Sequence, residues 1–134
     1  MFPARPYVAA LGFGARAVVA ADTDSLAVRA TVQNRDLNLR TKQQLSVALG
    51  SIESLGEQLQ GRRADLLLCN ILAPVIEALA SGFDDLLAAD GRGLLSGLLV
   101  DQAPRLRQVL ADLGWQITAE ASQGRWGLLE IRRR

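Results

Sequence analysis

The chain has 134 residues, of which 49% are hydrophobic and 22% charged, and its formal net charge is +1. These values fit one globular domain, and they exclude a disordered chain and a general attraction to nucleic acid or an anionic membrane. Histidine is absent, which excludes Ser-His-Asp catalysis, Cys-His catalysis and histidine-bound metals. The single cysteine, Cys69, excludes an internal disulfide, and its apolar surroundings predict a buried, unreactive thiol.

The chain ends carry no membrane or export signal that we recognise. No apolar run has transmembrane length, and Pro3 and Pro6 interrupt the order expected of a signal peptide. We therefore expect no membrane association and a cytoplasmic location. The terminal Arg132, Arg133 and Arg134 are expected to form a solvated end, the alternative being a contact with an acidic partner.

The first elements in chain order are the end of a helix and a buried strand. Residues 6–11 fit the end of a helix, which Gly12 and Gly14 close. Residues 17–21 (AVVAA) are apolar throughout, which is typical of a strand buried on both faces of a parallel sheet.

A helix, a second strand and a polar loop follow. Asp24 or Ser25 can cap the helix, whose apolar side continues to about Asn38. Alternating apolar residues predict a strand over residues 45–49. Residues 51–63 are polar, so we expect a loop with at most one helical turn.

The middle of the chain gives the clearest signals. Residues 65–69 (DLLLC) form the strongest buried-strand signal, and helical spacing predicts a helix over residues 73–89. A turn is expected at residues 90–91, and residues 93–99 (GLLSGLL) predict another buried strand.

The last third predicts a helix and a closing pair of strands. Asp101 can cap a helix that ends at Gly114. Two alternating runs, residues 115–119 and 126–130, flank a turn at residues 123–124, so we expect an antiparallel pair.

The order of these elements defines the expected fold class. Strands alternate with helices, which predicts an α/β domain over residues 1–134 with a Rossmann-like, mostly parallel sheet. The closing antiparallel strand pair, which has no helix between its strands, distinguishes this pattern from an ordinary dinucleotide-binding fold and is the usual finish of class I methyltransferases.

Two polar residues are candidates for a binding site, because ligands of open parallel sheets bind at the carboxyl ends of the strands. Asp22 follows the strand at residues 17–21 and could bind both ribose hydroxyls of an adenosine-type cofactor, or belong to a loop and cap with Asp24. Asn70 follows the strand at residues 65–69 and could bind a cofactor or nucleophile through its amide, or simply form a turn.

The glycines and tryptophans give weaker signals. None of five glycines follows a strand and opens a helix, as a cofactor-binding loop requires, so all are expected to be structural. They are Gly12, Gly14, Gly91, Gly93 and Gly97. Trp115 and Trp126 could stack on a ligand, but their alternating spacing favours a place in the core.

Four segments of the sequence occur in an informative order. They are VVAADTDSLAVRATVQNRDLN, DLLLCNILAPVI, GRGLLSGLLVDQAPRLRQVLADLGW and GRWGLLEIRR. Together they resemble the ribosomal protein L11 methyltransferase family, over residues 8–133. The most specific piece is NILA at residues 70–73, supported by LSG at residues 95–97 and the DQA that follows.

The resemblance implies a class I methyltransferase fold that binds S-adenosyl-L-methionine and trimethylates amino groups of ribosomal protein L11. By position, Asp22 resembles the ribose-binding acid of the family, and Asn70 its asparagine near cofactor and substrate. Neither a metal nor a specific catalytic residue is implied. Methyl transfer from a sulfonium depends mainly on alignment, so the lack of histidine is no objection.

The sequence also departs from the family pattern. The family has a first strand and a GxGxG-type loop before the helix that corresponds to residues 6–11, and residues 1–5 contain neither. The amino-terminal domain of the family, which grips the ribosomal protein, has no counterpart here. We therefore expect a truncated, impaired enzyme with weak or no cofactor binding, and self-association through exposed strand edges.

Two other functions stay open at this point. The chain could be a non-catalytic remnant or a partner-binding Rossmann-like module. It could also be a fragment of a nicotinamide-cofactor enzyme, because Asp22 would suit the ribose of NAD equally well. The closing strand pair and the NILA segment argue against this last reading.

Overall fold

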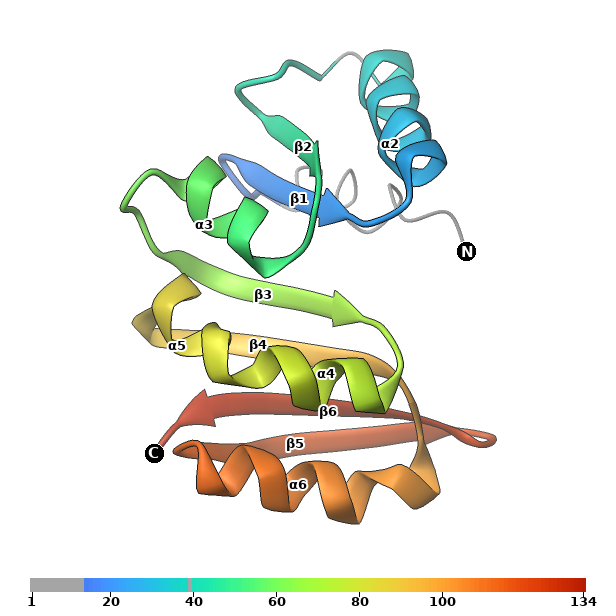
Figure 1. The fold of residues 1–134 in the computed structure, drawn as a ribbon, viewed down its shortest axis with the longest axis vertical. Coiled ribbons are helices and arrows are strands. Elements are labelled where there is room, and N and C mark those ends of the chain that lie inside the picture. Colours follow the sequence, from blue (N-terminus) through green and yellow to red (C-terminus); the bar gives the residue numbers. More distant parts are fainter. Residues whose placement is uncertain (1–13, 39) are drawn as a thin grey trace. The chain divides into compact units, whose positions relative to one another are not determined.

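The computed structural model describes residues 14–38 and 40–134 (Figure 1). The chain divides into two compact units, Met1–Gly61 and Arg62–Arg134. Each unit contains its own sheet among the described residues. The helix expected over residues 6–11 lies outside the described residues, and the expectation of a single domain stays a prediction.

The first unit is a parallel pair of strands with two helices. Its elements are β1 (Val18–Asp22), α2 (Ser25–Leu37), β2 (Leu45–Leu49) and α3 (Ile52–Leu59). The strands pair in parallel, from Val18 opposite Leu45 to Asp22 opposite Leu49. The sequence prediction is confirmed for β2 and is one residue early for β1.

Helix α2 starts as its sequence predicts, but the apolar side expected for it is wrong, because Leu26 and Leu37 are exposed and the buried residues are Thr31 and Arg35. The Asp24 side chain accepts a hydrogen bond from the Leu26 N–H at 2.9 Å, which caps the first turn. Buried Ala20 and Leu45 form the core between the strands and the helices. The buried Arg35 guanidinium donates to the Leu45 carbonyl at 3.3 Å and ties α2 to β2.

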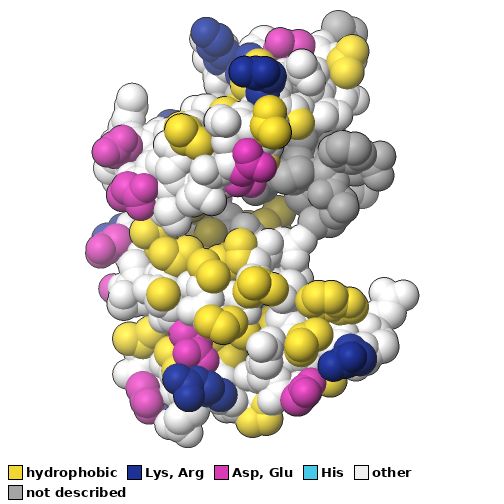
Figure 2. All heavy atoms as spheres, turned by 45° about the vertical axis from the view of Figure 1, so that its right-hand side comes forward, with side chains coloured by type: hydrophobic (Ala, Val, Ile, Leu, Met, Phe, Trp, Pro, Cys, Tyr) yellow, Lys and Arg dark blue, Asp and Glu magenta, His cyan; other side chains and the backbone are white. Residues whose placement is uncertain are grey.

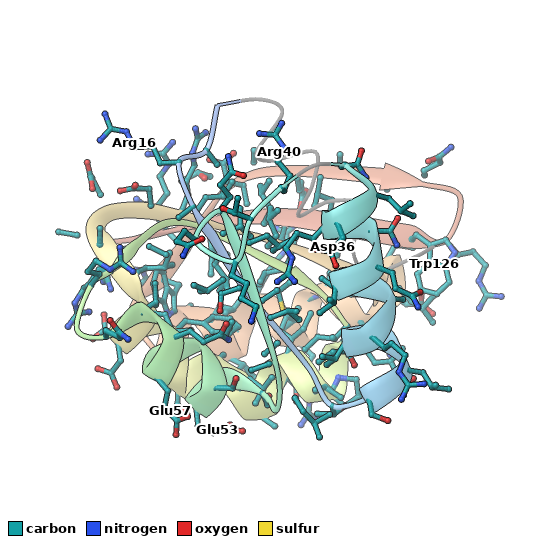
Figure 3. The ribbon with its side chains drawn as sticks, turned by 90° about the horizontal axis from the view of Figure 1, so that it is seen from above. Arg16, Asp36, Arg40, Glu53, Glu57 and Trp126 are labelled. Atoms are coloured by element: carbon teal, nitrogen blue, oxygen red, sulfur yellow. The ribbon has the colours of Figure 1, made fainter. Side chains whose placement is uncertain are left out.

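The prediction of a loop over residues 51–63 is wrong, because most of this segment forms helix α3. Its Gln58 side chain binds both neighbouring strands: its amide N–H donates to the Ala20 carbonyl of β1 at 2.9 Å, and its amide oxygen accepts from the Ser46 hydroxyl of β2 at 2.5 Å. Glu53 and Glu57 lie on the outer, exposed face of the helix (Figure 3). Tertiary contacts therefore override the low helix propensity of Gly56.

The second unit contains a four-stranded sheet and its covering helices. Its elements are β3 (Ala64–Asn70), α4 (Ala73–Leu79), the 3₁₀ turn η1 (Ala80–Gly82), α5 (Phe83–Leu86), β4 (Leu87–Leu99), the 3₁₀ turn η2 (Val100–Gln102), α6 (Ala103–Asp112), β5 (Trp115–Gln123) and β6 (Trp126–Arg133). The strand order is β3-β4-β6-β5, and β3 pairs with β4 in parallel.

The antiparallel finish predicted from the sequence is confirmed. Strand β6 pairs antiparallel with β4 on one side and with β5 on the other. Helices α4 and α6 lie side by side on one face of this sheet (Figure 1). Among the described residues, no helix is long and apolar enough to span a membrane.

The helix predicted over residues 73–89 is shorter in the structure. It ends at Leu86 after a 3₁₀ turn that contains Gly82, and β4 begins at Leu87. The turn expected at residues 90–91 lies inside β4. A Cβ on Gly91 would lie 3.0 Å from the Ala88 carbonyl and 3.1 Å from the Ala64 carbonyl, so glycine allows the irregular first half of this strand.

The core of the second unit lies between its sheet and helices. Its most deeply buried side chains include Ile76, Phe83, Leu87, Leu95, Leu98, Leu106, Leu110, Trp115, Leu129 and Ile131. The core prediction is thus confirmed for Trp115 and wrong for Trp126, which is 56% exposed. Trp126 pairs with Gln123 next to the hairpin turn and projects from the ribbon (Figure 3).

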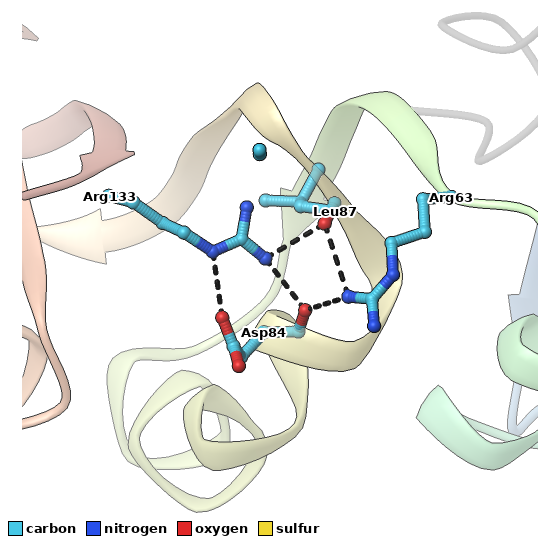
Figure 4. Close-up of a pocket in the computed structure, with 5 residues that line it drawn as sticks. Arg63, Asp84, Leu87 and Arg133 are labelled. Carbon is cyan, nitrogen blue, oxygen red and sulfur yellow. Dashed lines mark hydrogen bonds and ion pairs between the residues drawn. The ribbon is translucent and has the colours of Figure 1, made fainter.

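The expectation of a solvated arginine end is wrong for Arg133. Its guanidinium contacts the Asp84 carboxylate at 2.7 Å and donates to the carbonyls of Asp84 at 2.7 Å and Leu87 at 2.8 Å (Figure 4). It also donates to the Ala88 carbonyl and lies 5.1 Å from the centre of the Trp115 ring. Arg133 therefore caps the end of α5 and fixes where β4 begins.

The contacts of Arg133 predict that it stabilises the fold more than its neighbour does. We expect Arg133→Ala to lower the free energy of unfolding by about 2 kcal/mol, because it removes the ion pair with Asp84 and leaves the Ala88 carbonyl without its charged donor, while Arg63 still donates to the carbonyls of Asp84 and Leu87. Arg132→Ala makes the same change in charge but removes only an exposed pair with Glu130 at 3.4 Å, so we expect at most about 0.5 kcal/mol. Urea unfolding followed by far-UV circular dichroism measures both, and equal losses would contradict the assignment.

Candidate functional site

In the first unit, the candidate site lies where β1 and β2 end. Asp22 is the last residue of β1, and its carbonyl accepts a hydrogen bond from the Gly50 N–H at 2.9 Å. Gly50 follows β2 directly, so the two parallel strands present their carboxyl ends side by side. This is the edge at which open parallel sheets bind ligands.

The Asp22 carboxylate has one oxygen in a turn and one outside it. Its Oδ1 accepts the Asp24 N–H at 2.9 Å, which is the loop-and-cap arrangement weighed from the sequence. Within the described part of the chain, Oδ2 has no hydrogen-bond partner, and the residue is half-buried. The turn therefore fixes the carboxylate while leaving an oxygen able to accept a hydroxyl, so the two readings are compatible.

Sequence reasoning missed the neighbours of Asp22 at this edge. Gly50 has a φ of +147°, and a Cβ there would lie 2.8 Å from the Cβ of Ser54, so only glycine suits the step from β2 into α3. The Ser51 N–H donates to the Glu53 carboxylate at 2.9 Å, and this bond lowers the pKa of Glu53. The sequence signal for this edge was Gly50, which directly follows the alternating run at residues 45–49.

In the second unit, the candidate site lies where β3 and β4 run in parallel. Asn70 is the last residue of β3, opposite Ser96 of β4, and it is exposed. The next residue, Ile71, donates its N–H to the Ser96 carbonyl at 3.1 Å. Ala73, at the other end of the NILA segment, is buried where α4 begins. NILA is therefore the complete link from strand to helix.

Exposed apolar side chains surround this end of the second sheet. They are Leu72, Val75, Val100, Trp126 and Leu128. The first two follow Asn70, and Trp126 is paired with Leu99 near the end of β4. Figure 2 shows hydrophobic side chains gathered over the second unit. Such a concentration of exposed apolar surface is typical of a protein-binding face.

The two predicted site residues thus lie in separate units of the chain. Asp22 belongs to the first unit, with Gly50 beside it, and Asn70 belongs to the second, beside Ser96 and Gly97. Both stand at the carboxyl end of a parallel strand. In residues 14–38 and 40–134, no group of three or more acidic or cysteine side chains could hold a metal ion.

Cys69 lies next to Asn70 and behaves as the sequence predicts. It is partly buried and unpaired within β3, opposite Leu95 of β4. Burial raises the pKa of its thiol from 9.0 to about 11. The thiol is therefore neutral at physiological pH and is not a nucleophile for this site.

The sheet with its antiparallel finish defines a class of protein. A putative tRNA (m1A22) methyltransferase from Streptococcus pneumoniae, solved with S-adenosyl-L-methionine, superposes with a TM-score of 0.77 at 20% identity, covering 97% of this chain and 61% of its own. The fold is accordingly the Rossmann-like fold of class I methyltransferases.

A family model assigns the chain to one family within this class. The family model described as ribosomal protein L11 methyltransferase (PrmA) matches residues 7–134, so the chain belongs to that family. This removes the support for a nicotinamide enzyme, which rested on Asp22 alone.

Relatives agree with the family assignment. The ribosomal protein L11 methyltransferase of Parasynechococcus marenigrum (strain WH8102) is 73% identical over 127 residues, which are 95% of this chain and 44% of the relative. That of Prochlorococcus marinus (strain MIT 9303) is 62% identical, covering 94% of this chain and 42% of the relative. The chain thus spans under half the length of these relatives.

A solved structure gives the same result. The ribosomal protein L11 methylase of Lactobacillus delbrueckii subsp. bulgaricus superposes with a TM-score of 0.85 at 30% identity. The match covers 97% of this chain and 64% of that structure. Both the fold class and the family expected from the sequence are therefore confirmed.

The raised pKa of Cys69 predicts slow alkylation. With a pKa of about 11, the thiolate fraction at pH 8 is about a hundredfold below that of a thiol at the ordinary 9.0. Iodoacetamide should react correspondingly slowly with the folded chain, and the rate should keep rising with pH up to about 11. The chain unfolded in guanidinium chloride is the control and should react at the ordinary rate. Mass spectrometry follows both, and equal rates at pH 8 would refute the burial of the thiol.

Proposed function

We propose that this chain forms part of an S-adenosyl-L-methionine-dependent methyltransferase that modifies amino groups of ribosomal protein L11 in the cytoplasm. The observation that carries the proposal is the match of residues 7–134 to the L11 methyltransferase family, with Asp22 and Asn70 at strand ends where that fold binds ligands. Names of relatives also support L11 as the methyl acceptor.

Asp22 has the chemistry to hold the ribose of the cofactor. A carboxylate accepts two hydroxyl hydrogen bonds, and the turn bond from the Asp24 N–H at 2.9 Å holds Asp22 in place before any ligand arrives. Partial burial strengthens such bonds relative to those made in open water. S-adenosyl-L-methionine itself supplies the electrophilic methyl group on a sulfonium, so no metal or histidine is required.

Asn70 has the chemistry to bind the amino group that accepts the methyl group. Its amide carbonyl can accept a hydrogen bond from an amino group and so orient the nitrogen lone pair. An uncharged amide also does not stabilise an ammonium ion as a carboxylate would, and only the neutral amine can attack a methyl group. The exposed apolar residues around this strand end, including Leu72 and Val75, give a protein substrate a surface to bind.

We further propose that the isolated 134-residue chain binds the cofactor weakly. Its sequence contains no GxGxG stretch, whose backbone N–H groups would contact the methionine part of the cofactor. The described glycines have other uses: Gly91 and Gly93 pack against backbone or side chains within the sheet of the second unit.

Calorimetry with S-adenosyl-L-methionine or its demethylated product tests both parts of the proposal. The isolated chain should show no micromolar binding. A chimera in which the preceding sequence of the Parasynechococcus relative leads into this chain should bind and should transfer labelled methyl groups to ribosomal protein L11.

Variants of the chimera assign the role of Asp22. Asp22→Asn keeps the oxygen that accepts the turn bond but removes the charge, so we expect cofactor affinity to fall about tenfold. Asp36→Ala changes an exposed acid on α2 by the same charge and should leave affinity unchanged. Micromolar binding by the isolated chain would refute the inferred weakness, and an inactive chimera would refute the proposed function.

A second candidate is a non-catalytic, self-associating module, and the edge of β3 favours it. Among the described residues, β3 is the outer strand of its sheet, and it contains the apolar run Leu66, Leu67 and Leu68. Leu66 is 44% exposed. An apolar strand edge of this kind is a template for pairing with another chain.

From the exposed edge of β3 we predict that the chain self-associates and that a lysine at position 66 prevents it. We expect the chain to elute as a dimer or larger species in size-exclusion chromatography with light scattering, and Leu66→Lys to shift it to monomer. Leu113→Lys is the matched control, because Leu113 is 43% exposed but lies at the end of α6. A monomeric wild-type chain, or equal effects of both variants, would exclude pairing through β3.

A further inference from the structure

Gly97 lies in β4, next to the candidate site residue Asn70. In the pairing with β6, Ser96 lies opposite Leu128 and Leu98 opposite Gly127, so Gly97 is an extra residue on β4. Its φ is +84°, in the left-handed region that favours glycine. Gly97 is therefore the centre of a β-bulge, a device that redirects a strand locally.

The bulge brings Gly97 against the end of β3. A Cβ on Gly97 would lie 2.7 Å from the Ile71 carbonyl oxygen, 2.8 Å from Asn70 Oδ1 and 2.9 Å from the Ile71 nitrogen. Two of these three atoms belong to the backbone and cannot turn aside. The space beside the Asn70 amide therefore exists only because residue 97 has no side chain.

Neighbouring contacts hold the bulge in this position. On one side, the Ile71 N–H donates to the Ser96 carbonyl at 3.1 Å. On the other, Leu98 is fully buried, and a Cβ on Gly127 would lie 3.2 Å from its Cδ1 atom. Because β4 is fixed on both sides of Gly97, an added methyl group would have to displace residues 70–71.

Other glycines of the same unit lack this combination. Gly114 has a similar φ of +91°, yet no atom lies within 4 Å of the place of its Cβ. A Cβ on Gly93 would meet Ile131 Cγ1 at 2.9 Å, which is a flexible side chain in the sheet core. Gly97 alone among these three combines a left-handed φ with crowding by the backbone and by a predicted site residue.

We propose that Gly97 is a positioning residue, which sets the orientation of the Asn70 amide by allowing β4 to approach it. The proposal rests on the proposed function only for what Asn70 does, not for how it is held. A larger residue at position 97 should move the amide, because its Cβ would crowd Asn70 and Ile71.

Nuclear magnetic resonance of the 134-residue chain tests the geometry without any activity. The side-chain NH₂ signals of Asn70 are assigned by their loss in Asn70→Asp. Gly97→Ala should shift these signals and the backbone amide of Ile71. Gly114→Ala introduces the same backbone strain in open space and should leave them unchanged. Unchanged Asn70 signals in a folded Gly97→Ala chain would overturn the proposal.

A second variant covers the case in which Gly97→Ala does not fold. Asn70→Ala alters an exposed side chain, so the chain should stay folded. Loss of the amide beside Gly97 should shift the backbone amide of Gly97 but not that of Gly114. If the Gly97 signal does not move, the two residues are not in contact in solution and the proposal fails.

Kinetics of the chimera described above separate positioning from general destabilisation. Asn70→Ala and Gly97→Ala should each lower kcat about tenfold or more, and the double variant should lower it no further, because both act through one amide. Multiplying effects would mean that Gly97 acts independently of Asn70 and would overturn the proposal. An inactive chimera would refute the proposed function alone, since the resonance shifts decide the positioning of Asn70.

Discussion

The pairing of β4 with β6 is the constraint on which the second unit depends. Through it, β4 is held between an antiparallel partner and the parallel strand β3, and its inward side chains Leu95 and Leu98 become fully buried. The bulge at Gly97 is defined by this pairing, because an extra residue exists only relative to the register of β6. The environment of Asn70, at the end of β3, therefore depends on a pairing between β4 and β6.

Much of this fold could be predicted because strands rich in apolar residues leave a strong local signal, although β4 is buried as expected and β3 is not. The runs DLLLC and GLLSGLL are dominated by apolar residues, and both lie within strands of the structure. Helix α3 could not be found in this way, because polar Gln58 uses its amide to bind the Ala20 carbonyl. Its stability depends on the neighbouring strands, which no local pattern contains.

The other errors have the same origin in tertiary contacts. The helix after Asn70 ends early where Arg63 and Arg133, both outside it in sequence, bind the carbonyls of Asp84 and Leu87. Alternation placed Trp126 in the core, although its position beside the hairpin turn exposes it. Asp22 and Asn70 could be singled out since each follows a buried strand. Gly97 could be judged structural, but its contact with Asn70 depends on which strands are neighbours.

The two candidate residues differ in chemistry in a way that suits a histidine-free chain. In the proposed function, Asp22 offers charge to hydroxyl groups and Asn70 offers an uncharged amide to an amino group. Neither residue needs to change its protonation state. A reaction whose driving force resides in the cofactor asks the protein mainly for alignment, and alignment is what turns, bulges and strand ends supply.

The place of β6 in the strand order has a consequence for the synthesis of the protein. Among the described strands of this sheet, the order β3-β4-β6-β5 puts β6, the latest in sequence, in the interior, between two strands made earlier. During translation, β5 has no neighbour in this sheet until β6 emerges, and β4 lacks its antiparallel partner. The sheet of the second unit can therefore close only after β6 has left the ribosome, because β6 is the strand that joins β4 to β5.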